Sequence, residues 1–200
     1  MILYLHGFRS SPISFKARLM ADAMAARGLA GAWACPQLPA SPREAAELAL
    51  GIAREQLTGA PDPLALTVIG SSLGGFYATW LAETLGCKAV LLNPAVEAAR
   101  DLATQVGEHR MYHSDAPFMF LPEYVEELAA LHVGRITRPE RYFLVAATGD
   151  EVLDWREMRD RYAGCRQRIV QGGDHGLSGF ADWMPEVLEF ALGSTPNGPK

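Results

Sequence analysis

A serine set between glycines is the first candidate for chemistry in this 200-residue chain. Gly70-Ser71-Ser72-Leu73-Gly74 has the spacing Gly-x-Ser-x-Gly, with an apolar run before it and a helix-like apolar run after it. This pattern is typical of a nucleophile elbow, a sharp strand-to-helix turn that exposes one serine hydroxyl. The turn is strained and brings strand and helix together, so a Cβ at Gly70 or Gly74 would clash. Glycine- and serine-rich turns also occur as plain βα loops, and the other residues must decide between the two.

A serine hydroxyl needs a base within hydrogen-bond reach, and a carboxylate must orient that base. In an open parallel sheet these groups lie on loops at the carboxyl ends of strands, in the chain order serine, acid, histidine. Of the five histidines, His175 is the one in this order on a glycine-rich loop directly after an expected strand. His6 precedes the serine, and the others lie in or beside an irregular segment: His109, His113 and His132. We predict that Ser72 is the nucleophile and His175 the base.

The acid is expected on the loop after the strand predicted at 142–147. Asp150 is the first carboxylate past that strand. Glu151 is expected to point the other way, and Asp154 to cap the next helix, which makes Asp154 the second choice. Asp174 adjoins the histidine in sequence and is too close to reach its ring in the required geometry. We therefore predict Asp150 as the acid.

An oxyanion hole needs two N–H donors, and the residue after the serine supplies one. The other comes from a loop after an earlier strand, which His6-Gly7-Phe8 provides. We predict that the N–H groups of Phe8 and Leu73 form the hole and that His6 braces the loop. Arg9 follows directly, either to meet an anionic group of a substrate or as an ordinary exposed arginine.

The elements that must position these residues alternate between strand and helix. Short apolar runs predict strands at 2–5, 30–35, 64–69, 88–92, 142–147 and 167–170. Helical spacing predicts helices at 14–27, 41–57, 96–105, 154–162 and 180–192, and one from the elbow to residue 85. Strands that are nearly all apolar are typical of a parallel sheet covered on both faces. We predict an α/β fold with a mainly parallel sheet, as one domain over residues 1–192 with a mobile tail at 193–200.

One stretch, 107–139, does not fit the alternation. It is rich in large apolar side chains and contains a predicted helix at 122–131. Insertions at this place in an α/β sheet often cover the site, so we predict a lid-like insertion in which Met111, Phe118 and Phe120 contact substrate. The alternative is an ordinary helical excursion packed on the core.

The composition limits the function classes. The chain is 49% hydrophobic and 20% charged with a net charge of -5, and no block of like charge stands out. These values describe one globular domain and give no support to a nucleic-acid or anionic-membrane partner. No leader pattern and no apolar run of membrane-spanning length is present, and we expect a cytoplasmic protein.

Metals and cofactors are not indicated. The three cysteines, Cys35, Cys87 and Cys165, are far apart, which favours free thiols over a disulfide framework or a zinc site. His109 and His113 are four residues apart, but no third ligand is spaced with them. The glycines at 70–75 form neither a dinucleotide fingerprint nor a P-loop. We expect no metal and no cofactor.

Taken together, the motifs resemble those of the YqiA-like esterases, a small branch of the α/β-hydrolase superfamily. The resemblance spans nearly the whole chain and rests on Tyr4-Leu5-His6-Gly7-Phe8, Pro36-Gln37-Leu38-Pro39, the segment from Gly70 to Leu81, Asn93-Pro94-Ala95, the segment from Thr148 to Asp154, and Gly172-Gly173-Asp174-His175. This family usually has Gly-Asn-His where this chain has Gly-Asp-His, and the histidine is kept.

The resemblance implies a compact hydrolase that lacks the first antiparallel strands of the superfamily. It also implies hydrolysis of carboxylic esters that have short acyl chains, or hydrolysis of acyl thioesters. A thioesterase or an acyltransferase with the same three residues is the nearest alternative. A binding protein that keeps the fold without catalysis is a further one. The natural substrate and the oligomeric state are not specified by the sequence.

Overall fold

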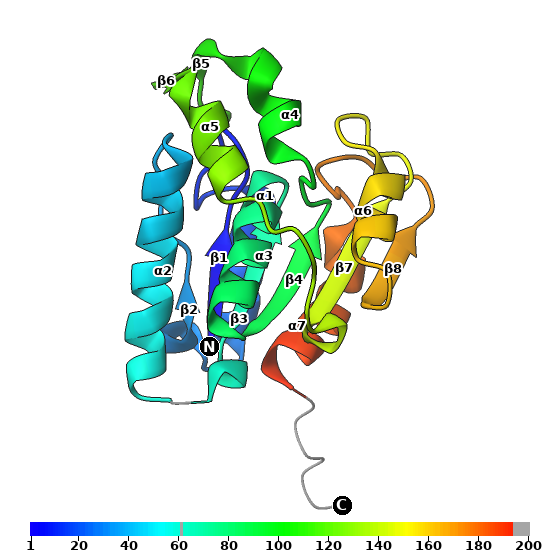
Figure 1. Ribbon diagram of the computed structural model, residues 1–200. Helices are drawn as coiled ribbons and strands as arrows, with labels where there is room; N and C mark the ends of the chain where they lie inside the picture. The colour runs from blue at the N-terminus through cyan, green and yellow to red at the C-terminus, as the bar shows by residue number, and fades with distance from the viewer. Residues whose placement is uncertain (61, 194–200) are drawn as a thin grey trace, which may run out of the picture.

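A six-stranded sheet runs through the middle of the molecule (Figure 1). The computed structural model describes residues 1–60 and 62–193, so most of the predicted tail, 194–200, lies outside the described residues. The strands pair in parallel throughout, in the order β2-β1-β3-β4-β7-β8. Their bounds are β1 Ile2–Leu5, β2 Trp33–Ala34, β3 Thr67–Ser71, β4 Lys88–Leu92, β7 Tyr142–Ala147 and β8 Arg166–Val170.

Helices cover both faces of this sheet, as predicted (Figure 1). One face carries α2 (Pro42–Thr58), α3 (Leu73–Leu85) and α6 (Trp155–Arg161), and the other carries α1 (Phe15–Ala26) and α7 (Phe180–Leu192). Successive strand side chains point to opposite faces, so an all-apolar strand fills both layers of the core. In β7, Leu144 belongs to the first layer and its neighbours Phe143 and Val145 to the second.

The order of the strands creates a crevice at the centre of the sheet. From β1 the chain passes to one side, to β2, and from β3 it passes to the other side, to β4. Because the loops after β1 and β3 leave adjacent strands in opposite directions, they open a gap at the carboxyl edge, where open α/β sheets bind ligands. The predicted nucleophile and the predicted oxyanion loop follow these two strands.

Three predicted elements differ in extent. The strand expected at 30–35 is a 3₁₀ turn, Ala30–Ala32, followed by the two-residue β2, which lies at the edge and has one neighbour. The elbow strand begins at Thr67 because a 3₁₀ turn that starts with Pro63 takes up the first apolar residues. The helix expected at 96–105 is shorter, with α4 at Ala98–Leu102 and a 3₁₀ turn at Ala103–Gln105.

The 107–139 stretch is more regular than predicted. It contains an antiparallel hairpin, β5 (Gly107–Arg110) and β6 (Pro117–Phe120), before the expected helix, α5 (Glu123–Ala130). The hairpin, α4 and α5 lie together beyond one end of the sheet (Figure 1). Glu127 on α5 also accepts hydrogen bonds from the Ser41 hydroxyl, at 2.7 Å, and from the Arg43 N–H, at 3.1 Å. The insertion is therefore fastened to the start of α2.

None of the helices within the described ranges combines the length and the hydropathy that crossing a bilayer requires.

Candidate active site

The turn between β3 and α3 has the geometry of a nucleophile elbow. Ser72 has φ 55° and ψ −122°, a conformation that side-chain-bearing residues rarely adopt. A Cβ on Gly70 would lie 2.1 Å from the Gly74 carbonyl oxygen, and one on Gly74 would lie 2.0 Å from the Leu5 carbonyl oxygen. Both glycines are therefore required by close backbone approach, as the motif predicts.

Ser72, His175 and Asp150 form one continuous hydrogen-bonded line. The Nε2 atom of His175 lies 3.0 Å from the Ser72 Oγ, and its Nδ1 lies 2.8 Å from the Asp150 Oδ2. The Asp150 side chain is fully buried, whereas the His175 side chain is 20% exposed. A carboxylate at Nδ1 fixes the proton on that nitrogen, which leaves Nε2 free to accept the serine proton.

The loop after β7 holds the Asp150 carboxylate in place. Its Oδ1 accepts hydrogen bonds from the N–H groups of Val152 and Leu153, each at 2.9 Å. Asp154, the second choice for the acid, caps α6 by accepting from the Arg156 N–H. The Asp150 oxygens are thus oriented by backbone donors as well as by the histidine.

Two other carboxylates lie close to the histidine. Glu151 was expected to point the other way, and this is wrong: its Oε2 accepts from the backbone N–H of His175 at 2.9 Å. Asp174 accepts from the N–H and the hydroxyl of Ser178, which stabilises the turn after the histidine. Both carboxylates therefore hold the backbone of this loop and leave the imidazole to Asp150.

Asn93, at the end of β4, is a positioning residue that sequence reasoning missed. It is completely buried, and its Oδ1 accepts from the Ala147 N–H at 2.8 Å. Its Nδ2 donates to the carbonyl oxygens of Asp174, at 3.0 Å, and His175, at 3.1 Å. An asparagine directly after a buried strand is the signal that could have identified it, because a buried amide needs partners on neighbouring strands or loops.

The predicted oxyanion donors flank the serine. A Cβ on Gly7 would lie 3.1 Å from the Ser72 Cβ, so the loop after β1 passes directly beside the nucleophile. Leu73 is the first residue of α3, where N–H groups have no acceptor within the helix. Phe8 and Leu73 both line the cavity that contains Ser72. The structure thus brings both residues to the serine.

His6 braces this loop from below, as expected. Its Nε2 accepts from the Leu38 N–H at 3.1 Å, and its Nδ1 lies 3.0 Å from the Gly7 carbonyl oxygen. Burial of the ring lowers the pKa of His6. The neutral ring can therefore accept at one nitrogen and donate at the other, which fixes the path of the loop.

Ser72 and His175 lie in the wall of a cavity of about 710 Å³. Its sides come from the oxyanion loop, the start of α1, the end of α4, the turn of the hairpin and the loop after β7. The residues that line it on these sides include Lys16, Asp101, Leu102, Tyr112, His113, Glu151 and Leu153. The insertion thus contributes to this cavity through Tyr112 and His113, which sequence reasoning did not select.

The four residues predicted to contact substrate, Arg9, Met111, Phe118 and Phe120, are not among the residues that line this cavity, and their contact with a substrate stays a prediction. The Arg9 Nε donates to the Arg110 carbonyl oxygen at 2.7 Å, and its guanidinium lies 4.6 Å from the centre of the Tyr112 ring. Phe118 and Phe120 stack edge-on against Phe8. The Met111 N–H closes the turn of the hairpin. The side chains of Arg9, Phe118 and Phe120 hold the hairpin against the oxyanion loop.

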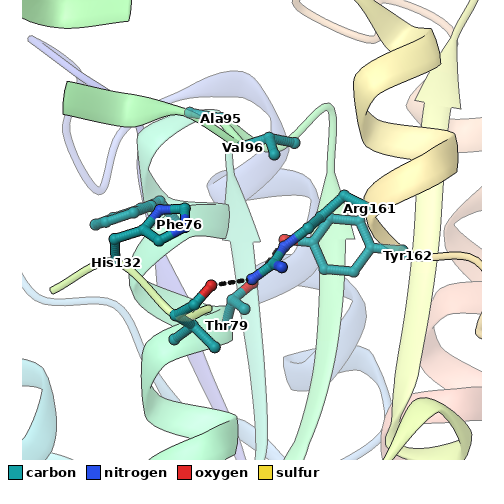
Figure 2. A pocket seen from close by; sticks show the side chains of 8 residues that line it. Phe76, Thr79, Ala95, Val96, His132, Arg161 and Tyr162 are labelled. Atoms are coloured by element: carbon teal, nitrogen blue, oxygen red, sulfur yellow. Dashed lines mark hydrogen bonds between the residues drawn. The ribbon is translucent and has the colours of Figure 1, made fainter. Parts of the chain in front are cut away.

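A second hollow, shown in Figure 2, lies between α3 and α6 and encloses only about 10 Å³. Phe76 and His132 form one side of it, and Arg161 and Tyr162 the other (Figure 2). The Thr79 hydroxyl lies 2.8 Å from the Tyr162 hydroxyl, and Arg161 donates to the carbonyl oxygens of Val133 and Gly134, so these groups already have partners. The hollow has room for about one water molecule and is a packing seam.

The described part of the chain holds no group of three or more histidine, cysteine or acidic side chains that could bind an ion. The His109 Nε2 lies 2.6 Å from the Gln105 carbonyl oxygen, so this ring is engaged by the backbone.

Comparisons with known proteins agree with the fold. The model of the family described as Uncharacterised protein family (UPF0227) matches residues 1–192. Alpha/beta hydrolase domain-containing protein 10 from mouse is 16% identical, with a TM-score of 0.68 over 94% of this chain and 89% of that one. A monoacylglycerol lipase from Paleococcus ferrophilus is 16% identical, with a TM-score of 0.67 over 97% and 94%. Est1E from Butyrivibrio proteoclasticus, bound to ferulic acid, is 14% identical, with a TM-score of 0.66 over 94% and 86%. The fold is that of the α/β hydrolases.

Proposed function

This chain belongs to the family described as Uncharacterised protein family (UPF0227), and from the geometry of its site we propose that it is a serine hydrolase of carboxylic esters. One observation carries the proposal: the hydrogen-bonded line from Ser72 through His175 to Asp150 begins at a strained elbow and opens into a cavity. A serine needs such a base and such an orienting carboxylate to become a nucleophile at neutral pH.

In the proposed first half-reaction, the Ser72 Oγ attacks the carbonyl carbon of the ester. The Nε2 of His175 takes the hydroxyl proton, and the buried Asp150 carboxylate stabilises the imidazolium that forms. The same Nε2–H then protonates the leaving alcohol, and an acyl-serine remains. In the second half-reaction, water attacks the acyl carbon and gives its proton to His175. The bond between the acyl carbon and the Ser72 Oγ then breaks, the carboxylic acid leaves, and His175 returns the proton to Ser72.

Both half-reactions pass through a tetrahedral oxyanion. In the proposal, the N–H groups of Phe8 and Leu73 bind it, because they lie on the two loops that meet at Ser72. The start of α3 adds its favourable electrostatic potential for negative charge. Loss of one such donor typically lowers kcat by about 10²–10³.

The cavity favours a small ester with an apolar part. Among the residues around its volume of about 710 Å³ are Phe8, Phe15, Leu102, Val152 and Leu153. Pockets of this size with apolar walls and a few polar groups are typical of small-molecule sites. The similar structures named above, a monoacylglycerol lipase and Est1E bound to ferulic acid, agree with this substrate class.

The test is hydrolysis of 4-nitrophenyl butyrate by the wild type and by Ser72→Ala. The alanine variant should lower kcat by about 10⁶ and keep its fold by circular dichroism, as deletion of a nucleophile does elsewhere. Thr84→Ala is the matched control, because it removes an exposed hydroxyl from the same helix, outside the cavity lining. Labelling of the wild type by a fluorophosphonate, and its absence in Ser72→Ala, identifies the reacting serine directly.

Two outcomes would contradict the proposal. If Ser72→Ala kept its esterase activity, another residue would be the nucleophile. If the wild type neither hydrolysed esters nor reacted with the fluorophosphonate, the chain would be a non-catalytic member of the fold. A butyryl thioester assayed in parallel, with and without an added acyl acceptor, distinguishes an esterase from a thioesterase or an acyltransferase.

A further inference from the structure

Lys16 places a cationic side chain in the wall of the cavity that contains Ser72. It lies in the first turn of α1, beyond the oxyanion loop, and its Nζ donates to the Gly176 carbonyl oxygen. An ammonium group has three N–H donors, so two of them remain for other partners. Within residues 1–60 and 62–193, no carboxylate forms an ion pair with Lys16.

The other charged side chains of the cavity differ from Lys16 in this respect. The Glu151 carboxylate already accepts the His175 N–H at 2.9 Å. Asp101 is paired with Arg100 at 2.7 Å. Each carboxylate in the cavity wall therefore has a partner within the protein, whereas the ammonium of Lys16 has a single neutral one.

Partial burial of the Lys16 ammonium removes part of its hydration, which is energetically unfavourable for the charged form. Burial lowers the pKa of Lys16 to about 8, against a smaller opposing effect of the Asp174 and Asp150 carboxylates. The side chain thus still carries its proton at neutral pH, although much of its hydration is lost. A desolvated cation without an anionic partner is a group that a bound anion stabilises.

The place of Lys16 beside the reaction indicates which part of a substrate it meets. Its partner Gly176 directly follows His175, the residue that protonates the leaving alcohol in the proposed mechanism. The alcohol part of an ester must therefore lie on the side of the cavity where Lys16 is found.

We propose that Lys16 binds a carboxylate on the alcohol part of the substrate, so that the preferred esters are anionic. This rests on the proposed ester hydrolysis and specifies its substrate class. Lys16 is then a specificity-determining residue, and the bound carboxylate completes the ion pair that the protein itself lacks.

The test compares two esters that differ in one charge. The butyrate ester of 4-hydroxybenzoate carries a carboxylate on its alcohol part, and the butyrate ester of methyl 4-hydroxybenzoate is its neutral counterpart. The measured quantity is the ratio of kcat/KM for the charged ester to kcat/KM for the neutral one. In Lys16→Met this ratio should fall about tenfold, which corresponds to loss of one charge-assisted contact. Lys16→Arg should keep most of the ratio, because the charge remains.

Each other outcome has a defined meaning. An equal fall of kcat/KM on both esters would overturn the proposal and make Lys16 a support for the loop of His175. An unchanged ratio in Lys16→Met would overturn it as well. If Lys16→Met does not fold, Lys16→Gln is measured in its place. Failure of the underlying function is distinguishable, since the wild type would then hydrolyse neither ester.

Discussion

The Asn93 side chain donates a hydrogen bond from its Nδ2 to the carbonyl oxygen of His175 at 3.1 Å. The same side chain accepts from the Ala147 N–H, at the end of the strand that precedes Asp150. One buried amide therefore sets the distance between the loop of the base and the strand of the acid. The hydrogen bonds of Asn93 to both backbones support the approach of the imidazole to the carboxylate, which lie 2.8 Å apart.

Asn93→Ala should lower kcat by about 10–100-fold, because small displacements of catalytic groups from their reactive geometry lower the reaction rate strongly. It should also lower the free energy of unfolding by about 1–3 kcal/mol, since buried partners lose their hydrogen bonds. Steady-state kinetics and urea unfolding measure the two effects. Asn93→Asp keeps an acceptor for Ala147 but sets an oxygen against two carbonyl oxygens, so it should not rescue kcat. Wild-type kcat in both variants would show that the base loop is positioned without Asn93.

Gly75→Ala should damage the elbow from its helical side. The new Cβ would lie 2.5 Å from the Pro94 Cβ, so the loop after β4 must move. We expect a loss of about 1–3 kcal/mol in the free energy of unfolding, typical of overpacking, together with a lower kcat.

Gly51→Ala is the matched control, because nothing lies within 4 Å of the added methyl group. In the middle of α2 it should stabilise the fold by about 0.5–1 kcal/mol. Equal unfolding curves for the two variants would contradict the tight contact at Pro94.

Arg9→Ala should raise KM several-fold and change kcat much less. The substitution removes the hydrogen bond to the Arg110 carbonyl and the stacking on Tyr112, which together hold the hairpin beside the cavity. Stacking of this kind contributes about 0.5–1 kcal/mol at exposed sites. Arg9→Lys should resemble alanine, because an ammonium reproduces neither the planar stacking nor the Nε donor. A rise in KM for anionic esters alone would instead make Arg9 a substrate-binding residue.

Glu83 should make stability depend on acid pH. Burial by itself raises the pKa of its carboxyl, but hydrogen bonds from Thr137 and Tyr142 and the charge of Arg141 outweigh it, so the pKa is lowered. A carboxyl whose folded pKa is lowered contributes stability above its unfolded pKa, about 4.3, and loses it as the pH falls through the folded value. Glu83→Gln should therefore unfold more easily than the wild type at about pH 7, by about 1–2 kcal/mol. This difference should shrink at about pH 3, as measured by urea unfolding; a constant difference would mean that the charge of Glu83 is not involved.

Sequence reasoning located the residues around Ser72 because local rules specify them. The glycines of the elbow are required by backbone contact. Asp150 follows the apolar strand β7 and His175 follows its parallel neighbour β8, so their meeting follows from a parallel sheet. The roles of Asn93 and Lys16 were not predicted, because they depend on partners remote in the sequence, Ala147 and Gly176.

The cavity wall could not be predicted for a different reason. Its contribution from the insertion depends on the register of the hairpin, in which Arg110 pairs with Pro117. That register puts Tyr112 and His113 in the turn, toward the cavity, and directs Phe118 and Phe120 toward Phe8. The first strand of the hairpin, Gly107–Arg110, has no apolar alternation that would indicate a strand.

The strained backbone of Ser72, with φ 55°, lowers the stability of the folded protein for as long as a serine is kept there. A residue with a side chain pays about 1–3 kcal/mol for such a conformation, and glycine avoids most of it. Ser72→Gly should therefore produce a protein that melts at a higher temperature and has no nucleophile. Selection for thermal resistance alone would therefore favour loss of the serine. Ser72→Gly would thus provide a more stable, inactive form of the protein in which intact substrates can be trapped.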